Sequence, residues 1–418
     1  MKIYKFGGAS VKDAESIRNV GNILKQEGTE NCLLVISAMG KMTNAFEKVV
    51  HAYCYDQKLL TSALHDIEEY HSVIIQELFE DESNPVFKDV HQLIKTLKTL
   101  IDGGLGQDRY DFAYDQIVSY GELISTTIVS HYLNSVGIAT VWNDVRRLIE
   151  TDCSYRDAKV DWKGTQELIS TRIDPSKLNV VQGFLGVDMM GFTTTLGREG
   201  SDYTAGIFAY CLNAESVTIW KDVPGVLNAD PRVFKDTQLL EQISYEETIE
   251  MAFYGASVIH PKTIQPLQSK NIPLYVRSFV DTSLQGTKIT RGVAISPKLP
   301  CFIVKKDQIL VSISARDFSF MVEDNISHVF KLLHQYLLKV NLIQNSAISF
   351  SVCVDNKFNQ FDTFYEELKS SYKVEVIKEV DLYTIRHFDD DSLKEITAKG
   401  TPVFTQNNKE TAQIVIKK

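Results

Sequence analysis

The spacing of apolar and polar residues divides the chain into short buried strands and amphipathic helices. Continuous apolar runs at residues 3–6 and 32–38 are typical of strands buried in a parallel sheet. Four more strands are expected at residues 138–142, 178–184, 217–220 and 272–276. Helical stretches alternate with most of these strands, so the pattern predicts an α/β domain with a largely parallel sheet.

Two helical stretches interrupt this alternation. Residues 59–102 are typical of a charged helical insertion that breaks at Asn84-Pro85, and residues 111–134 are typical of one further helix. Gly121 and Glu122 interrupt the second helix. A glutamate beside a glycine within a helix is usually solvated, so the pattern alone gives Glu122 no function.

The pattern changes near residues 297–300. Beyond this point, strands are expected at residues 309–314, 348–354, 374–377 and 382–386, with helices at 326–338 and 361–370. We interpret these elements as the βαββαβ order of a ferredoxin-like domain. A short helix near residues 392–398 and strands near Val403 and at residues 413–416 follow. The sequence therefore predicts two regions, residues 1–298 and 301–418.

Residues 192–212 are the most distinctive stretch, because a strand rich in β-branched residues leads through GREGSD into a helix. Gly197 and Gly200 allow a sharp turn, and Ser201 is suited to cap the helix. The free amides and the positive dipole end of such a helix favour an anion. An ordinary strand-to-helix turn with a capping serine is the alternative.

A second glycine turn follows the first strand. Gly7 and Gly8 end this strand, and residues 9–12 open a helix. Lys5, at the end of the strand, is placed to reach a phosphate held by the amides of the turn, although a tight turn with a surface lysine is the alternative. The strand at residues 32–38 ends with Ser37, and Thr43 follows in a loop; hydroxyl groups at this end of a strand often face a ligand.

Composition and charge exclude several classes of function. The 418 residues allow two or three domains, and 44 Lys and Arg against 54 Asp and Glu give a net charge of −10, which argues against a nucleic-acid partner. No stretch approaches 18 uninterrupted apolar residues, and the N-terminus does not have a leader pattern, so we expect a soluble cytoplasmic protein without a membrane partner. Six scattered cysteines form no metal-ligand spacing and are expected to be reduced packing residues.

The two commonest nucleotide-loop fingerprints are missing from the chain. GxxxxGK[ST] does not occur, and the glycines at residues 104 and 106 follow a helix and lead to Arg109. The motifs present are KFGGAS from Lys5, SYGE from Ser119, GREGSD from Gly197, WKDVPGVLNADPR from Trp220 and GASVIHPKTIQP from Gly255. In this order, with the βαββαβ tail, they resemble aspartate kinase of the amino-acid kinase family over nearly the whole chain.

The resemblance implies an amino-acid kinase fold, with a largely parallel sheet between helices, followed by two small α+β ferredoxin-like ACT domains, the second truncated. It also implies transfer of the γ-phosphoryl group of MgATP to the side-chain carboxylate of L-aspartate, giving 4-phospho-L-aspartate, the first step of lysine, threonine and methionine biosynthesis. The attacking carboxylate is already ionised, so catalysis should depend on positioning and charge neutralisation rather than on a general base.

Matching the motifs residue by residue implies the roles. Lys5 would supply charge to the phosphates, and Asp202 would organise the lysines near them. Arg198 would bind a substrate carboxylate and Glu122 the ammonium group. Further substrate contacts are implied for Ser37, Thr43 and Ser201. The implied ATP contacts are Lys5, Phe6, Gly7, Gly8, Ser10, Lys221, Asp222, Leu227, Arg232 and Ser257. No residue is implied as a direct Mg²⁺ ligand, because phosphates and water can hold the metal.

The chain departs from the family pattern at four positions. Ser257 replaces a lysine associated with ATP, Lys221 stands where threonine is common, and Leu227 where tyrosine is common. These changes put ATP affinity in question more than reaction type. Glu199 replaces a glycine or a neutral residue beside the anion site and is expected to point outward.

Two other functions compete with this interpretation. A kinase acting on glutamate or N-acetylglutamate is the nearer one, and KFGGAS, SYGE and the tail argue against it. A catalytically dead amino-acid sensor is the other, and the joint retention of the catalytic and substrate-binding residues argues against that.

The tail also implies regulation, because paired ACT domains sense end-product amino acids and often form dimers. We therefore expect a homodimer through residues 309–418. Asn341 and Ala347 replace two carboxylates of lysine-inhibited relatives, and Asp324 replaces a glycine at a helix start. These changes predict weak or absent inhibition by lysine, unless they retune the site for another amino acid.

Overall fold

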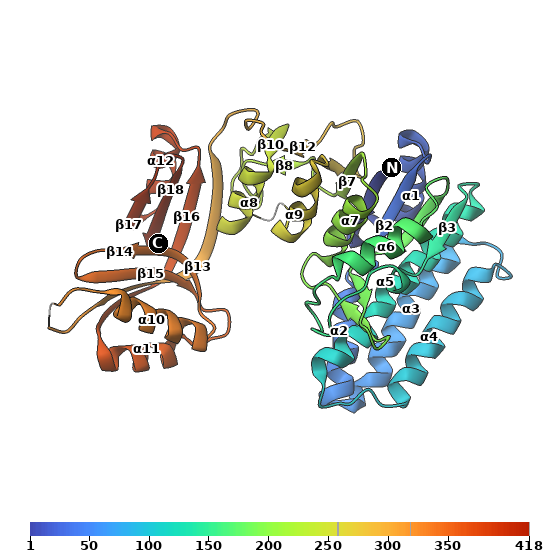
Figure 1. The fold of residues 1–418 in the computed structure, drawn as a ribbon, viewed down its shortest axis with the longest axis horizontal. Coiled ribbons are helices and arrows are strands. Elements are labelled where there is room, and N and C mark those ends of the chain that lie inside the picture. The colour runs from blue at the N-terminus through green and yellow to red at the C-terminus, as the bar shows by residue number, and fades with distance from the viewer. Residues whose placement is uncertain (257–258, 318, 418) are drawn as a thin grey trace. The chain divides into compact units, whose positions relative to one another are not determined.

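The computed structural model describes residues 1–256, 259–317 and 319–417, and the chain forms two compact units (Figure 1). The first unit comprises Met1–Val226, Leu239–Ile249 and Ile259–Ile295, and the second comprises Leu227–Gln238, Glu250–Val258 and Ser296–Lys418. Two short stretches that precede the predicted boundary at residues 298–301 thus belong with the second unit. The chain passes between the units near β8 (Val226–Leu227) and β9 (Leu239–Leu240) and within α8 (Tyr245–Tyr254).

An eight-stranded sheet forms the centre of the first unit, in the order β10-β12-β11-β7-β1-β2-β4-β3. Its strands are β1 (Lys2–Phe6), β2 (Cys32–Ile36), β3 (Thr140–Asn143), β4 (Leu178–Gln182), β7 (Ser216–Lys221), β10 (Gln242–Ser244), β11 (Leu274–Ser278) and β12 (Thr287–Thr290). Every pairing is parallel except that between β11 and β12. The predicted α/β architecture with a largely parallel sheet is confirmed.

Strand β1 lies between β2 and β7, and its last residue, Phe6, pairs with Ile36 and Trp220. The three strands are parallel and in step, so the segments that follow them leave the sheet at the same edge. Ligands of open parallel sheets bind at the edge formed by the carboxyl ends of the strands. The sheet register therefore brings together the glycine turn after β1 and Ser37 after β2.

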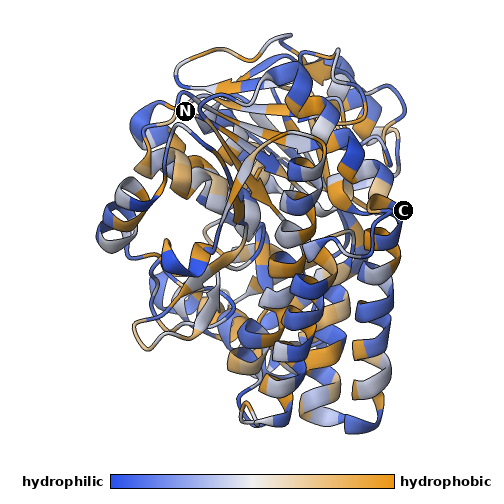
Figure 2. Cartoon of the chain, turned by 90° about the vertical axis from the view of Figure 1, so that its right-hand side faces the viewer, coloured by the Kyte–Doolittle hydropathy of each residue, from blue (hydrophilic) through white to orange (hydrophobic). Residues whose placement is uncertain are grey.

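The helices that accompany this sheet are α1 (Ala14–Glu27), α2 (Met42–Tyr55), α3 (Leu60–Leu78), α4 (Pro85–Asp102), α5 (Tyr110–Ser135), α6 (Trp162–Arg172), α7 (Gly200–Cys211) and α9 (Pro261–Lys270). The predicted helical insertion is α3 and α4, with Asn84 capping α4 and Pro85 at its first position. Apolar and polar residues alternate along these long helices (Figure 2). None of the helices described has the length and apolarity needed to cross a bilayer.

Helix α5 continues through Gly121 without a break, and almost all of its residues are buried. The expected interruption and solvated glutamate are therefore wrong. A Cβ on Gly121 would lie 3.2 Å from atoms of Ala38 and Phe46, so the glycine allows close packing of the helix. The same packing carries Glu122 into the interior, where it is 2% exposed.

Two local predictions near the glycine turns need correction, whereas the strand predicted before Gly197 is present. Residues 8–11 form a 3₁₀ turn, and α1 begins only at Ala14, because Asp13 caps it through the Ser16 amide. The strand before Gly197, β6 (Thr193–Thr195), pairs with β5 (Leu185–Val187) in a separate antiparallel hairpin. Ser201 does not cap α7, since the helix begins one residue earlier.

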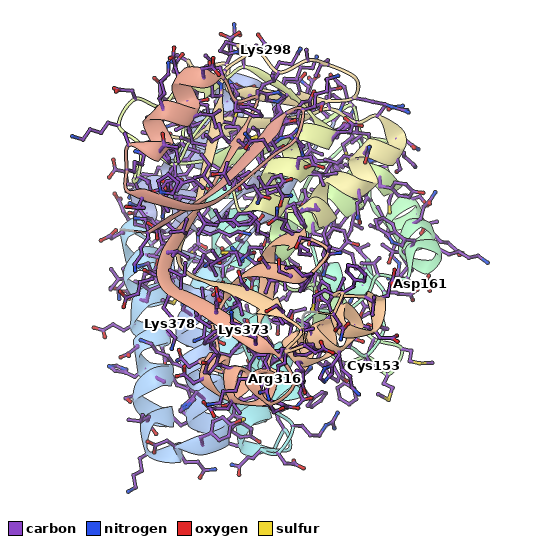
Figure 3. All side chains as sticks on the ribbon, turned by 90° about the vertical axis from the view of Figure 1, so that its left-hand side faces the viewer. Cys153, Asp161, Lys298, Arg316, Lys373 and Lys378 are labelled. Carbon is purple, nitrogen blue, oxygen red and sulfur yellow. The ribbon has the colours of Figure 1, made fainter. Side chains whose placement is uncertain are left out.

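The second unit contains a six-stranded antiparallel sheet in the order β14-β15-β13-β16-β18-β17. Its elements are β13 (Cys301–Ser314), α10 (Glu323–Gln335), β14 (Lys339–Asn345), β15 (Ser349–Asp355), α11 (Phe361–Ser371), β16 (Lys373–Arg386), α12 (Asp390–Thr397), β17 (Thr401–Asn407) and β18 (Thr411–Lys417). The two expected small domains thus share the long strands β13 and β16. Figure 3 labels Lys373 and Lys378, both on β16, where two separate strands were predicted.

The cysteines are all free, as predicted, but they do not share one role. Cys32, Cys211, Cys301 and Cys353 are buried packing residues. Cys153 is exposed and is labelled in Figure 3, so the predicted packing role is wrong there.

Candidate active site

A cavity of about 530 Å³ lies in the first unit and is lined by residues from six stretches of the chain. Its lining consists of Lys5, Gly8, Ser37, Ala38, Gly40, Thr43, Asn44, Tyr114, Glu122, Arg156, Phe184, Gly197, Arg198, Glu199, Gly200, Ser201 and Asp202. Every catalytic and substrate-binding residue predicted from the sequence is in this set. The sequence motifs therefore converge on one cavity, although their roles stay predictions.

The charged centre of the cavity is an ion pair between Lys5 and Asp202. Lys5 Nζ lies 2.7 Å from Asp202 Oδ1, and both side chains are buried. Burial alone would raise the pKa of Asp202, but the positive charges of Lys5 and Lys221 outweigh this effect and lower it. Asp202 is thus an ionised carboxylate in the first turn of α7, and it fixes the lysine beside the cavity.

The backbone of the turn after β1 approaches its neighbours closely. A Cβ on Gly8 would lie 2.6 Å from the carbonyl oxygen of Gly40 and 2.9 Å from that of Ala38, so only glycine fits. Ser10 is buried and its hydroxyl donates to the Gly7 carbonyl, which stabilises the turn. The ring of Phe6 is fully buried and stacks on Trp220, so any ligand contact of Phe6 must come from its backbone.

Glu122 is a buried carboxylate that lacks a counter-charge in the described part of the chain. Its Oε1 accepts a hydrogen bond from the Ala38 amide at 3.4 Å, while its Oε2 is buried without a hydrogen-bond partner among those residues. Burial raises the pKa of Glu122 to about 8, and the amide only partly opposes this shift. A bound cation would supply the missing partner and restore the ionised form.

The loop before α7 presents Arg198 and Glu199 to the cavity. Arg198 is exposed, and neither a hydrogen bond nor an ion pair to another described residue holds it. Glu199 has a left-handed backbone, with φ of 54°, and its Oε2 accepts a hydrogen bond from the His260 amide at 3.0 Å. The prediction that Glu199 points outward is wrong, because this bond ties it to the residue that caps α9.

Three hydroxyl residues complete the predicted substrate site. Ser37 follows β2, and its carbonyl accepts a hydrogen bond from Ser125 of α5. Thr43 lies in the first turn of α2 rather than in a loop, because that helix begins at Met42. Ser201 lies in the first turn of α7 and packs directly on Gly183.

Tyr114, Arg156 and Asn44 also line the cavity, but sequence reasoning missed them. Asn44 and Tyr114 occupy ordinary helical positions, where a polar or aromatic residue gives no distinct signal. Arg156 follows Tyr155 in a polar stretch without a glycine motif. Only the tertiary fold brings these residues to the site.

The predicted nucleotide residues are more dispersed. Lys221 ends β7, next to β1, and acts electrostatically on Asp202; the exposed Asp222 follows it. Leu227 and Arg232 belong to the second unit, where Arg232 is paired with Asp230 at 2.7 Å. Ser257 lies outside the described residues. Within those residues, no group of three or more His, Cys, Asp and Glu side chains is arranged to hold a metal ion.

Comparison with known proteins agrees with this geometry. A family model described as "Amino acid kinase family" matches residues 1–278. A bifunctional aspartokinase/homoserine dehydrogenase 2 of Arabidopsis thaliana is 29% identical over 386 residues, covering 88% of this chain and 42% of the relative. The chain thus spans less than half the length of that relative.

This chain covers a larger share of two Escherichia coli proteins. Lysine-sensitive aspartokinase 3 is 29% identical over 357 residues, which are 84% of this chain and 78% of the relative. The crystal structure of E. coli aspartokinase III in complex with aspartate and ADP has a TM-score of 0.81 and 26% identity, covering 100% of this chain and 96% of that one. These findings confirm the resemblance to aspartate kinases, and the match over residues 1–278 shows that the chain belongs to the amino acid kinase family.

Proposed function

We propose that the protein transfers the γ-phosphoryl group of MgATP to the side-chain carboxylate of L-aspartate, giving 4-phospho-L-aspartate and ADP. The observation that carries this proposal is Glu122, a buried carboxylate with one unpartnered oxygen in a cavity that also holds arginines and Lys5. A free α-amino acid with a second carboxylate satisfies all of these groups at once. The complex of E. coli aspartokinase III with aspartate and ADP supports the same choice of ligands.

The proposed mechanism depends on charge placement. Glu122 binds the ammonium group and Arg198 a carboxylate, so the substrate is oriented before reaction. Lys5, held by Asp202, neutralises charge on the migrating phosphoryl group. The Gly7 and Gly8 backbone and Lys221 are assigned to ATP, and its Mg²⁺ would be held by phosphates and water.

The Glu122 carboxylate also distinguishes aspartate from N-acetylglutamate. N-acetylglutamate carries no ammonium group and would leave Glu122 buried without a counter-ion. Glutamate has the ammonium group, but its side chain is one methylene longer, and a single methylene typically changes specificity by about 10- to 200-fold. We therefore expect aspartate to be preferred over glutamate by a measurable factor rather than absolutely.

The test uses the full chain with MgATP and a panel of L-aspartate, D-aspartate, L-glutamate and N-acetyl-L-glutamate, measuring ADP release. The acyl phosphate product is trapped with hydroxylamine. ADP release and hydroxamate with L-aspartate, both lost in Lys5→Met, support the proposal. Aspartate binding by calorimetry without any ADP release would instead favour an amino-acid sensor.

We also propose a homodimer formed through residues 309–418. Among the strands that the structure describes, β14 lies at the edge of its sheet and pairs only with β15, and Ile343 on β14 is 45% exposed. Light scattering of the full chain, compared with Ile343→Lys, tests the proposal. A monomeric wild-type protein at micromolar concentration would refute it.

A further inference from the structure

Arg156 lines the same cavity as Arg198 but comes from a different loop. Its guanidinium carbon lies 4.5 Å from the centre of the Tyr114 ring and 5.6 Å from that of Tyr110. One nitrogen lies 3.3 Å from Asp111 Oδ1, and another lies 3.6 Å from Glu47 Oε1. The aromatic faces and carboxylates orient the guanidinium.

These contacts do not use all of the binding capacity of Arg156. Both ion-pair distances exceed the 2.7–2.9 Å or so of a strong charged hydrogen bond, and the side chains of Glu47 and Asp111 are 46% and 64% exposed. A guanidinium has five donors, so several stay available to a ligand. Arg156 is therefore held in place with free donors at the wall of the cavity.

A single buried carboxylate, Asp115 of α5, positions both arginine loops. Its two oxygens accept hydrogen bonds from the Arg156 amide, each at 3.1 Å, and from the amide and hydroxyl of Thr195 at 2.8 and 2.7 Å. Thr195 precedes Arg198 by three residues, and its carbonyl accepts a hydrogen bond from the Ala158 amide. The loops that carry Arg156 and Arg198 are thus pinned side by side.

The fold also places Arg156 away from the phosphoryl end of the cavity. Gly8 packs on Ala38, whose amide donates to Glu122, so the glycine turn lies near Glu122. Arg156 stacks on Tyr114, which precedes Glu122 by eight residues on α5, so the backbones of Tyr114 and Glu122 are about 12 Å apart along the helix axis. Arg156, Tyr114 and Glu122 nevertheless line one cavity. A ligand whose reacting carboxylate faces Lys5 would direct its other end toward Tyr114.

We propose that Arg156 is a specificity-determining residue that, together with Arg198, binds the α-carboxylate of the substrate, the one that is not phosphorylated. This inference rests on the proposed function, since it takes L-aspartate as the substrate. Two guanidiniums on one carboxylate make recognition depend on the negative charge of that group. An analogue with a neutral amide in its place loses this contact.

The experiment compares L-aspartate with L-aspartic acid α-amide, using wild-type protein, Arg156→Met and Arg156→Lys. Asp115 holds the backbone amide and not the side chain of Arg156, so these substitutions leave the loop anchored. Arg146→Lys is the matched control, because Arg146 is also paired with a carboxylate, Asp144, but does not line the cavity. Initial rates give KM and kcat for each substrate and for ATP.

We expect Arg156→Met to raise KM for aspartate by about 10- to 100-fold, to change KM for ATP and for the α-amide little, and so to remove most of the discrimination between the two substrates. The KM of Arg156→Lys for aspartate should lie between those of wild type and Arg156→Met, since lysine keeps the charge without the planar guanidinium. Equal losses for both substrates, or no loss for either, would overturn the inference.

Calorimetric binding separates this inference from the proposed function. If the protein binds aspartate but releases no ADP, the proposed function fails, and the ratio of aspartate to α-amide affinity in each variant still decides the role of Arg156. If wild-type protein does not bind aspartate, both the proposed function and the inference about Arg156 are refuted.

Discussion

The free energy of unfolding of the ligand-free wild-type protein should fall, relative to that of Glu122→Gln, as the pH rises. Burial raises the pKa of Glu122 from 4.5 to about 8. Between these values the unfolded chain releases the proton while the folded protein keeps it, so folding stability falls with rising pH. Below pH 4.5 the stabilisation is fully present, and it is lost as the pH rises through about 8.

The magnitude follows from the shift itself. The difference, 8 − 4.5 = 3.5 pKa units, corresponds at about 1.36 kcal/mol per unit to a total of roughly 5 kcal/mol. Between pH 5.5 and 7.5 the group should lower the free energy of unfolding by roughly 3 kcal/mol. Glutamine does not titrate, so its variant lacks this loss. A buried amide without a partner costs about 1 to 3 kcal/mol at every pH and does not change the slope.

The assay is urea unfolding of both proteins at pH 5.5, 6.5 and 7.5 without ligand. Other titrating groups cancel in the difference between them. Glu167→Gln on α6 is the control, because Glu167 is exposed and does not line the cavity. Aspartate should stabilise the wild type more at pH 7.5 than at pH 5.5, since its ammonium group needs the ionised carboxylate, and Glu122→Gln should bind it weakly throughout. A wild-type to Glu122→Gln difference that is flat across this range would refute the reasoning.

Four other outcomes are expected. Arg198→Lys should lower kcat/KM for aspartate by an amount that corresponds to a loss of about 2 to 4 kcal/mol of transition-state stabilisation, with little change in ATP binding, because lysine cannot form paired bonds to a carboxylate. Unaltered rates at low aspartate would contradict this. Lys5→Met should abolish turnover and, by leaving Asp202 buried without its partner, lower the free energy of unfolding by about 3 to 5 kcal/mol, as checked by urea titration. Lys221→Thr should weaken ATP binding by about 1 to 2 kcal/mol in calorimetry, and unchanged affinity would make Lys221 an ordinary surface residue. Lysine should inhibit weakly or not at all at sub-saturating aspartate, and half-inhibition below millimolar lysine would show that the departures at Asn341 and Ala347 were misjudged.

The glycine turns and the parallel strands could be predicted because their signals are local. A buried strand needs a short apolar run, and a close backbone approach such as that of Gly8 to Gly40 needs glycine. The resemblance implies that Asp202 organises the lysines near the phosphates, and the structure places Lys5 and Asp202 in one ion pair.

The errors came from side chains whose roles depend on distant partners. Glu199 was expected to point outward, but the His260 amide, 61 residues away, draws it inward. For Glu122, the local pattern alone predicts a solvated side chain, because a helix normally exposes a glutamate beside a glycine, and only the resemblance implies a role in binding an ammonium group. The burial of Glu122 follows from Ala38 and Phe46 packing on Gly121, which the local pattern does not encode.

Helix α5 shows why local sequence signals and contacts with distant residues have to be distinguished. A helix buried on every side has no apolar stripe, so periodicity cannot distinguish its structural positions from its functional ones. Asp115 and Glu122 are both carboxylates on this helix, and burial raises the pKa of each, to about 6 and about 8. Asp115 is satisfied by hydrogen bonds that fix the two arginine loops, whereas Glu122 keeps one oxygen without a partner. A buried carboxylate without a partner, such as Glu122, is expected where a ligand supplies the missing positive charge. The contrast between Asp115 and Glu122 on one helix therefore supports the proposal that Glu122 binds the ammonium group of the substrate.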